Sequence, residues 1–148
     1  MAKFKMEGMK ELQKSIKKLG EVPQKCVTPA AKKGMNIALK AAKPLTPVEE
    51  GNLKKGLKLK GEKSRLKGKK VYQVTFSSSM NDIFVKVSKD GKRSYYPASQ
   101  EYGYFAKNGR YIPGFHFLKK SLSNNSSSIT KKIIYEMSKN IDKALEGK

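Results

Sequence analysis

Apolar residues recur at helical spacing in the first third of the chain and predict two helices. The first covers residues 8–19, and Gly20 marks its end. Lysines separate its apolar positions, which are Met9, Leu12, Ile16 and Leu19. The second begins after Val22-Pro23 and stops at Pro44 and Pro47. Because its apolar face consists mainly of small residues, we expect it to pack closely on a sheet or another helix. This face is formed by Val27, Ala30, Ala31, Gly34, Ile37, Ala38, Ala41 and Ala42.

The middle of the chain alternates with a period of two, which predicts strands over residues 71–77 and 83–88. The serine-rich stretch between them predicts a turn, so we expect the two strands to pair as a β-hairpin. Asn52 is expected to cap a single helical turn after Gly51. The lysine-rich run 58–70 is expected to form strand ends around an exposed, mobile loop whose basic residues are Lys58, Lys60, Lys63, Arg65, Lys67, Lys69 and Lys70.

The last third of the chain returns to helical patterns. Residues 95–104 are aromatic and suit one or two helical turns laid against the sheet, and residues 107–110 resemble an exposed tip. A long C-terminal helix is expected from near Phe115, with a break near Asn124-Asn125. We therefore predict a single α+β domain over residues 1–148, a small antiparallel sheet packed by N-terminal helices and a long C-terminal helix.

The charge of the chain requires a partner or an assembled setting. The 148 residues include 33 lysines and arginines against 12 acids, a formal net charge of +21. A compact monomer with this charge repels itself unless anions lie nearby. Arginine, the residue that forms bidentate contacts, occurs only as Arg65, Arg93 and Arg110, which argues against base-specific recognition of nucleic acid.

The residues that usually carry catalysis are sparse. His116 is the only histidine, lies between two phenylalanines, and is expected to pack or cap a helix rather than act as a general base. Cys26 is the only cysteine, so no internal disulfide can form. Nearby lysines favour the ionised forms of Glu49 and Glu50, whereas a general acid needs the opposite shift. We expect no enzyme, no metal, no cofactor and no membrane span.

Two segments resemble a known family when they are taken together. The first motif segment, Ala42 to Leu57, resembles the "A-P-V-D-T-G-x-L-R-x-S" signature of the small tail-component and neck proteins of long-tailed phages, a family that includes tail-completion proteins. Thr46-Pro47-Val48 stands for Ala-Pro-Val, Gly51 for the glycine and Leu53 for the leucine. Gly56 occupies the position of the usual serine.

The second motif segment comprises Tyr96–Gly103 and Ile112–Leu122. It resembles the family's "Y-A-x-x-x-E-[FY]-G-T … P-A-[RH]-P-F-[LM]-x-P-[AS]-[LF]". Glu101-Tyr102-Gly103 and Phe117-Leu118 match, whereas Tyr104 replaces threonine and Phe115-His116-Phe117 replaces Arg-Pro-Phe. With the flanking helices, the resemblance covers nearly the whole chain.

The resemblance implies a structural virion protein, assembled in the host cytoplasm, that forms a ring at the head–tail junction or the upper end of the tail. In this family the ring is most often sixfold. Its partners would be copies of itself and neighbouring neck and tail proteins, with non-specific contact to DNA in the lumen. The candidate interface or structural residues are Pro47, Gly51, Leu53, Glu101, Tyr102, Gly103, Phe117 and Leu118.

Elementary chemistry gives the same residues folding roles. Gly51 and Gly103 suit positive φ or close backbone approach, and Glu101 can accept hydrogen bonds from free backbone donors or pair with a lysine. Tyr102, Phe115 and Phe117 are expected to pin the last helix onto the sheet. The basic loop can face a partner or DNA.

Two other functions fit parts of the sequence. A basic nucleic-acid-binding protein would combine the net charge of +21 with clustered tyrosines as stacking surfaces, namely Tyr95, Tyr96, Tyr102 and Tyr104. A ribonuclease-like toxin would use His116 and Lys119, and would lose RNA cleavage in a His116→Ala variant. Lysines scattered over every predicted element are more typical of a solvated surface than of a dedicated groove.

Overall fold

The computed structural model describes residues 9–63, 66 and 68–146, and for residues 9–19 only the backbone helix is described. The α+β class and the antiparallel pairing are confirmed, but the strands form three separate two-stranded sheets. The elements are α1 (Met9–Leu45), α2 (Asn52–Gly56), β1 (Leu57–Gly61), β2 (Tyr72–Phe76), η1 (Ser78–Met80), α3 (Asn81–Phe84), β3 (Val85–Val87), β4 (Arg93–Tyr95), α4 (Tyr96–Tyr102), β5 (Gly103–Phe105), β6 (Tyr111–Pro113), α5 (Phe117–Ser123) and α6 (Ser126–Leu145).

The two predicted N-terminal helices are one helix. α1 continues through Gly20, Pro23 and Pro29 for 37 residues, although each internal proline removes one backbone hydrogen bond. The helix continues because packing of its buried face compensates for these losses. This face consists of small residues four positions apart, namely Cys26, Ala30, Gly34, Ala38 and Ala42. α1 ends where the buried Thr46 hydroxyl donates to the Ala42 carbonyl, at 2.7 Å.

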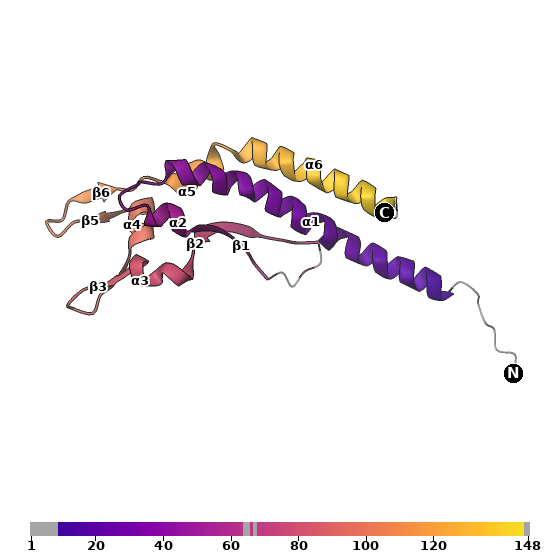
Figure 1. The fold of residues 1–148 in the computed structure, drawn as a ribbon, viewed down its shortest axis with the longest axis horizontal. Coiled ribbons are helices and arrows are strands. Elements are labelled where there is room, and N and C mark those ends of the chain that lie inside the picture. The colour runs from indigo at the N-terminus through magenta and orange to yellow at the C-terminus, as the bar shows by residue number, and fades with distance from the viewer. Residues whose placement is uncertain (1–8, 64–65, 67, 147–148) are drawn as a thin grey trace, which may run out of the picture.

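α6 runs antiparallel to α1 and packs on its small-residue face (Figure 1). Gly34 makes the close approach possible, because a Cβ atom built there would lie 2.9 Å from Ile133 Cδ1 and 3.3 Å from the Ile129 carbonyl oxygen. Asn140 donates to the Cys26 carbonyl near the far end of the contact, at 3.3 Å. Within the described residues, no helix is long and apolar enough to cross a membrane.

β1 and β2 lie against α1 on the side opposite α6 (Figure 1). They pair antiparallel, with Leu57 opposite Phe76 and Gly61 opposite Tyr72. The predicted hairpin between residues 71–77 and 83–88 is therefore wrong. Residues 78–84 form η1 and α3 instead, and β3 pairs with β4 across the turn expected at residues 89–92.

An aromatic cluster joins the sheet to the helices. Phe117 is fully buried with Ala42 and Leu57, and its ring centroid lies 6.1 Å from that of Phe76. Phe76 also packs edge-on against the buried Phe84, with the ring centroids 5.5 Å apart. The core thus connects α1, β1, β2, α3 and α5.

In the C-terminal third the helices agree with the sequence pattern, whereas the strands β5 and β6 were not predicted. α4 occupies residues 96–102 and ends at Gly103, and the expected tip at residues 107–110 connects β5 and β6. The predicted break near Asn124-Asn125 separates α5 from α6. We call the end of the molecule that carries α2, α3, α4 and the β3–β4 and β5–β6 hairpins the distal end (left in Figure 1).

Candidate interaction surface

The fold brings the two motif segments together at the distal end. Leu57, the last residue of the first segment, shares the buried core with Phe117 of the second. The Tyr96 hydroxyl donates to a Glu49 carboxylate oxygen at 3.5 Å, which forms a second link between the segments. Leu53 is buried and Leu118 packs partly against the core, so both serve the fold.

Glu101 fixes the position of α5. Its carboxylate accepts hydrogen bonds from the backbone N–H groups of Leu118 and Lys119, with N···O distances of 2.9 and 3.0 Å. Its backbone carbonyl accepts from the N–H of His116 at 3.1 Å. The first N–H groups of a helix have no hydrogen-bond partners inside the helix. Glu101 supplies acceptors for two of these groups in α5, and its side chain is buried, with 3% of the residue exposed. The expected acceptor role of Glu101 is confirmed.

Two glycines allow the backbone contact that places Glu101 there. Gly103 has φ +91° and ψ 178°, a conformation nearly restricted to glycine, and a Cβ atom built there would lie 2.8 Å from the Gly114 nitrogen. A Cβ atom built on Gly114 would lie 2.5 Å from the Gly103 nitrogen. The matching Glu101-Tyr102-Gly103 of the second segment is thus in direct backbone contact with Gly114.

The first motif segment forms a turn and then α2. Gly51 has φ +75°, as expected, and precedes α2. Asn52 does not cap the helix; its side-chain amide donates to Glu50 at 2.8 Å. Gly56, which stands where the family has serine, faces Phe84, and a Cβ atom built there would lie 2.5 Å from the ring. The buried Phe84 ring explains this departure.

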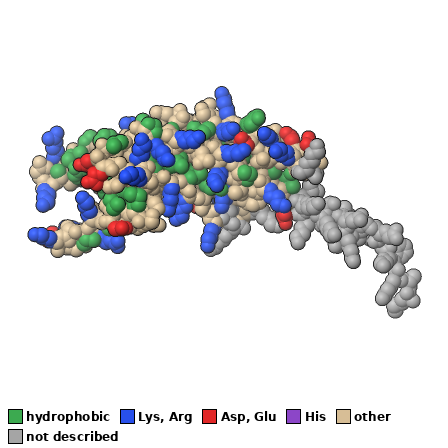
Figure 2. Space-filling view, viewed as in Figure 1, with side chains coloured by type: hydrophobic (Ala, Val, Ile, Leu, Met, Phe, Trp, Pro, Cys, Tyr) green, Lys and Arg blue, Asp and Glu red, His purple; other side chains and the backbone are tan. Residues whose placement is uncertain are grey.

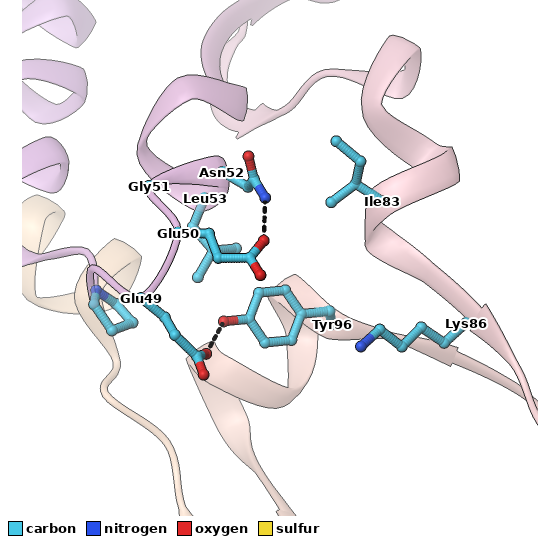
Figure 3. Close-up of a pocket in the computed structure, with 9 residues that line it drawn as sticks. Glu49, Glu50, Gly51, Asn52, Leu53, Ile83, Lys86 and Tyr96 are labelled. Carbon is cyan, nitrogen blue, oxygen red and sulfur yellow. Dashed lines mark hydrogen bonds between the residues drawn. The ribbon is translucent and has the colours of Figure 1, made fainter.

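A shallow pocket of about 190 Å³ lies between the motif turn, α3 and α4 (Figure 3). We call it the Glu49–Glu50 pocket; its lining residues are Pro47, Glu49, Glu50, Gly51, Asn52, Leu53, Ile83, Lys86 and Tyr96. Burial raises the pKa of the Tyr96 phenol, and the charges of Glu49 and Glu50 raise it further. The phenol therefore stays protonated at neutral pH and acts as a hydrogen-bond donor toward Glu49.

The β5–β6 hairpin, also at the distal end, exposes aromatic side chains. Phe105 is 75% exposed and stacks at a tilt on Tyr111, with ring centroids 5.2 Å apart. Tyr102 and Phe115 are 68% and 52% exposed, so the prediction that they pin the last helix onto the sheet is wrong. Phe117 alone of the three does so. Figure 2 shows hydrophobic side chains on this end of the molecule, and lysine and arginine side chains spread over the coloured part of the surface.

The predicted basic loop is only partly described. Lys58 and Lys60 lie on β1, Lys63 follows it, and Lys69 and Lys70 precede β2. Arg65 and Lys67 lie outside the described residues. Where the loop is described, the Gly68 N–H donates to Gln24 of α1 at 3.1 Å, and Lys70 donates to the Glu62 carbonyl at 2.6 Å. Its mobility and its contact with DNA or a partner stay predictions.

The residues considered for catalysis are dispersed. His116 precedes α5 with φ +53° and makes no side-chain capping hydrogen bond, and Cys26 is buried on α1. Neither lines the Glu49–Glu50 pocket. Among the described residues, no group of three or more His, Cys, Asp or Glu side chains is placed to hold a metal ion.

Sequence reasoning missed the pocket and an ion triad. Glu49 and Glu50 were considered only as a catalytic pair, although their position inside a motif turn could have marked them as surface-forming. The triad joins α1 to α6: Glu136 lies 2.6 Å from Lys33 Nζ and 2.9 Å from Lys132 Nζ. The spacing of Lys132 and Glu136 indicates one of these pairs, but Lys33 is brought in only by the fold.

Comparison with protein families gives a match over most of the chain. The model of the HK97-gp10-like family, described as "Bacteriophage HK97-gp10, putative tail-component", matches residues 10–105. The matched range contains the first motif segment and Tyr96–Gly103 of the second. Neither the curated proteins nor the solved structures contain a match to the chain.

Proposed function

The chain belongs to the HK97-gp10-like tail-component family of bacteriophages, and from that membership we propose that it is a structural virion protein that forms a ring where head meets tail or at the tail's upper end. In this proposal the ring, of sixfold symmetry, joins or completes the tail. It assembles in the host cytoplasm and contacts neighbouring neck and tail proteins.

The exposed distal end is the observation that supports assembly most strongly. Both motif segments build it, yet it presents large apolar side chains to solvent, among them Phe105, Tyr102 and Val48. Clustered exposed aromatic side chains on one end of a small protein are typical of protein–protein interfaces. The motif residues Glu101, Gly103 and Phe117 are the buried support that holds this surface in place.

The proposed role requires no catalysis. The work of the protein in this proposal is positioning, done by surfaces that meet copies of itself and its neighbours. Part of the net charge of +21 would face the lumen, where Lys side chains meet DNA phosphates and make the contact dependent on salt. The remaining lysines would face solvent or acidic surfaces of neighbouring proteins.

Mass measurement tests the proposal. Native mass spectrometry and sedimentation velocity would be applied to the purified protein, alone and mixed with the tail-tube protein of the same phage. A closed ring or a stable co-complex is the expected result. A persistent monomer in both samples that binds short RNA or DNA tightly, with affinity falling steeply with salt, would replace it with the nucleic-acid-binding alternative.

A further inference from the structure

The β5–β6 hairpin is held at its base by Glu101, but within the described residues its two strands are not part of a larger sheet. β5 and β6 have three residues each and, among the described strands, pair only with one another. Isolated two-stranded hairpins are marginally stable in water. The side chains on and beside the strands are exposed although they are large and apolar: Tyr102, Tyr104, Phe105, Tyr111, Ile112 and Phe115. A packing partner would stabilise this hairpin and cover its aromatic side chains.

The tip of the hairpin is cationic. Lys107 and Arg110 are exposed, and no acidic residue occurs in the sequence between Glu101 and Glu136. In the described part of the chain, neither Lys107 nor Arg110 lies within 4.0 Å of a carboxylate. Arg110 is one of three arginines among 33 basic residues, and arginine is the cation best suited to bind carboxylates at an interface.

The Glu49–Glu50 pocket has the complementary properties. Glu49 and Glu50 are the only two acidic residues that are adjacent in the sequence. Each accepts a hydrogen bond from an uncharged side chain: Glu49 from Tyr96, and Glu50 from Asn52. Neither has a basic group within 4.0 Å in the described part of the chain. Lys86 also lines the pocket, and apolar walls come from Pro47, Leu53 and Ile83.

This inference rests on the ring proposed above: we propose that the β5–β6 hairpin of one copy packs on the Glu49–Glu50 pocket of the next copy. Arg110 enters between the two carboxylates, and the aromatic side chains of the hairpin cover the exposed apolar rim near Val48. The contact joins two different surfaces of the same chain, so it repeats head to tail and generates a ring when the rotation closes.

A second copy is the proposed occupant because the hairpin tip and the pocket of the same chain carry opposite charges. Subunits with a net charge of +21 repel one another, so a self-contact must place unpaired carboxylates against cations at the interface. The Glu49–Glu50 pocket and the hairpin tip satisfy this condition together. Bidentate hydrogen bonds between a guanidinium and carboxylates are stronger than those of neutral groups and fix the orientation of the two copies.

Charge reversal tests the contact. Arg110→Glu, and separately Glu49→Lys with Glu50→Lys, are expected to weaken self-association about tenfold or more in sedimentation velocity. The variant that combines all three changes is expected to recover association. Lys92→Glu, at the tip of the β3–β4 hairpin, is the matched control with the same charge change. Both variants lower the net positive charge equally and so reduce the general repulsion between copies. Self-association that is weakened by Arg110→Glu but not by Lys92→Glu therefore identifies a specific contact at Arg110.

Cysteine cross-linking locates the contact without changing its charges. Cys26 is buried, so a variant with Asn108→Cys and Val48→Cys carries the only accessible thiols among the described residues. Oxidation should give a ladder of multimers on a denaturing gel, ending at the ring size, and each single variant should give no ladder. Native mass spectrometry reports ring formation independently of the cross-link.

The outcomes separate this contact from the ring itself. Rings that form in the wild type but survive Arg110→Glu and give no ladder overturn the hairpin contact and leave the ring intact. Cross-linking of the hairpin cysteine to an added tail protein instead of to another copy also overturns it. Absence of any ring or co-complex in the wild type contradicts the proposed function and this contact with it.

Discussion

Glu101, near the end of α4, accepts a hydrogen bond from the backbone N–H of Leu118 at the start of α5, with 2.9 Å between the carboxylate oxygen and the nitrogen. Seventeen positions separate the two residues, and the β5–β6 hairpin lies between them. The aromatic hairpin is therefore closed at its base by a buried side chain, so the motif glutamate determines where the exposed surface points.

Replacing Glu101 should destabilise the fold. Glu101→Ala leaves two N–H groups at the α5 N-terminus without an acceptor, which we expect to cost about 2–3 kcal/mol in the free energy of unfolding. Glu101→Gln retains one acceptor oxygen and should cost about 1 kcal/mol. Urea denaturation measures both, with the exposed Asp90→Ala as control. Equal stability of Glu101→Gln, Glu101→Ala and wild type would show that the carboxylate does not hold α5.

Gly34 and Gly20 provide a matched pair on α1. A Cβ atom at Gly34 would overlap Ile133, whereas nothing lies within 4 Å of one at Gly20. Gly20→Ala should stabilise the protein by up to about 1 kcal/mol through helix propensity. Gly34→Ala should destabilise it by about 1–2 kcal/mol because the α1–α6 contact is overpacked. Thermal denaturation measures the difference, and combining Gly34→Ala with Ile133→Ala should cost less than the sum of the two.

Gly103 and Gly109 separate backbone strain from crowding. Both have positive φ, +91° and +79°, but only at Gly103 would a Cβ atom meet other backbone. Gly109→Ala should cost about 1 kcal/mol, the strain of the left-handed conformation alone. Gly103→Ala should cost at least twice as much by urea denaturation, and its near-ultraviolet circular dichroism should change because the hairpin tyrosines are displaced. Identical losses at the two positions would contradict the close backbone contact.

Glu136 should make stability depend on pH. Hydrogen bonds from Lys33 and Lys132 lower the pKa of Glu136 from 4.5 to about 2. A carboxylate whose pKa is lower in the folded protein stabilises it fully above the unfolded pKa, and this contribution is lost as pH falls from 4.5 toward 2. The urea midpoint of Glu136→Gln should thus lie below that of wild type at neutral pH and approach it in acid.

Asp142→Asn is the control for that measurement, since it removes the same charge from an exposed position on α6. Its stability difference from wild type should stay near zero over the whole range of pH. A constant gap between Glu136→Gln and wild type from neutral pH down to pH 2 would contradict the role of the ion triad.

Phe117 and Phe105 should separate folding from assembly. Phe117→Ala empties a fully buried site and should cost about 3–5 kcal/mol in unfolding free energy. Phe105→Ala removes an exposed ring, so it should change monomer stability by less than about 0.5 kcal/mol. Sedimentation velocity should nevertheless show weaker self-association for Phe105→Ala. Unchanged association would indicate that the aromatic hairpin surface does not take part in the ring.

The sequence predicted the features that depend on neighbouring residues. The period of the apolar positions gave the helical ends of the chain, and Gly103, Asn124-Asn125 and residues 89–92 marked real boundaries. The α+β class followed from the order of these elements. The resemblance in the two motif segments gave the family, because a motif is recognised from residue types at fixed spacing along the chain.

Tertiary packing decided the rest. Pro23 and Pro29 normally interrupt a helix, but α1 continues through them because its small residues are buried against α6, an element a hundred positions away. A period of two identifies a strand without identifying its partner, so the sequence predicted that β2 pairs with residues 83–88. In the structure Phe84 is buried beside Gly56, and β2 pairs with β1 instead. Glu49, Glu50 and Tyr96 form one pocket only after the chain folds, since proximity of side chains in space is set by packing and not by distance along the sequence.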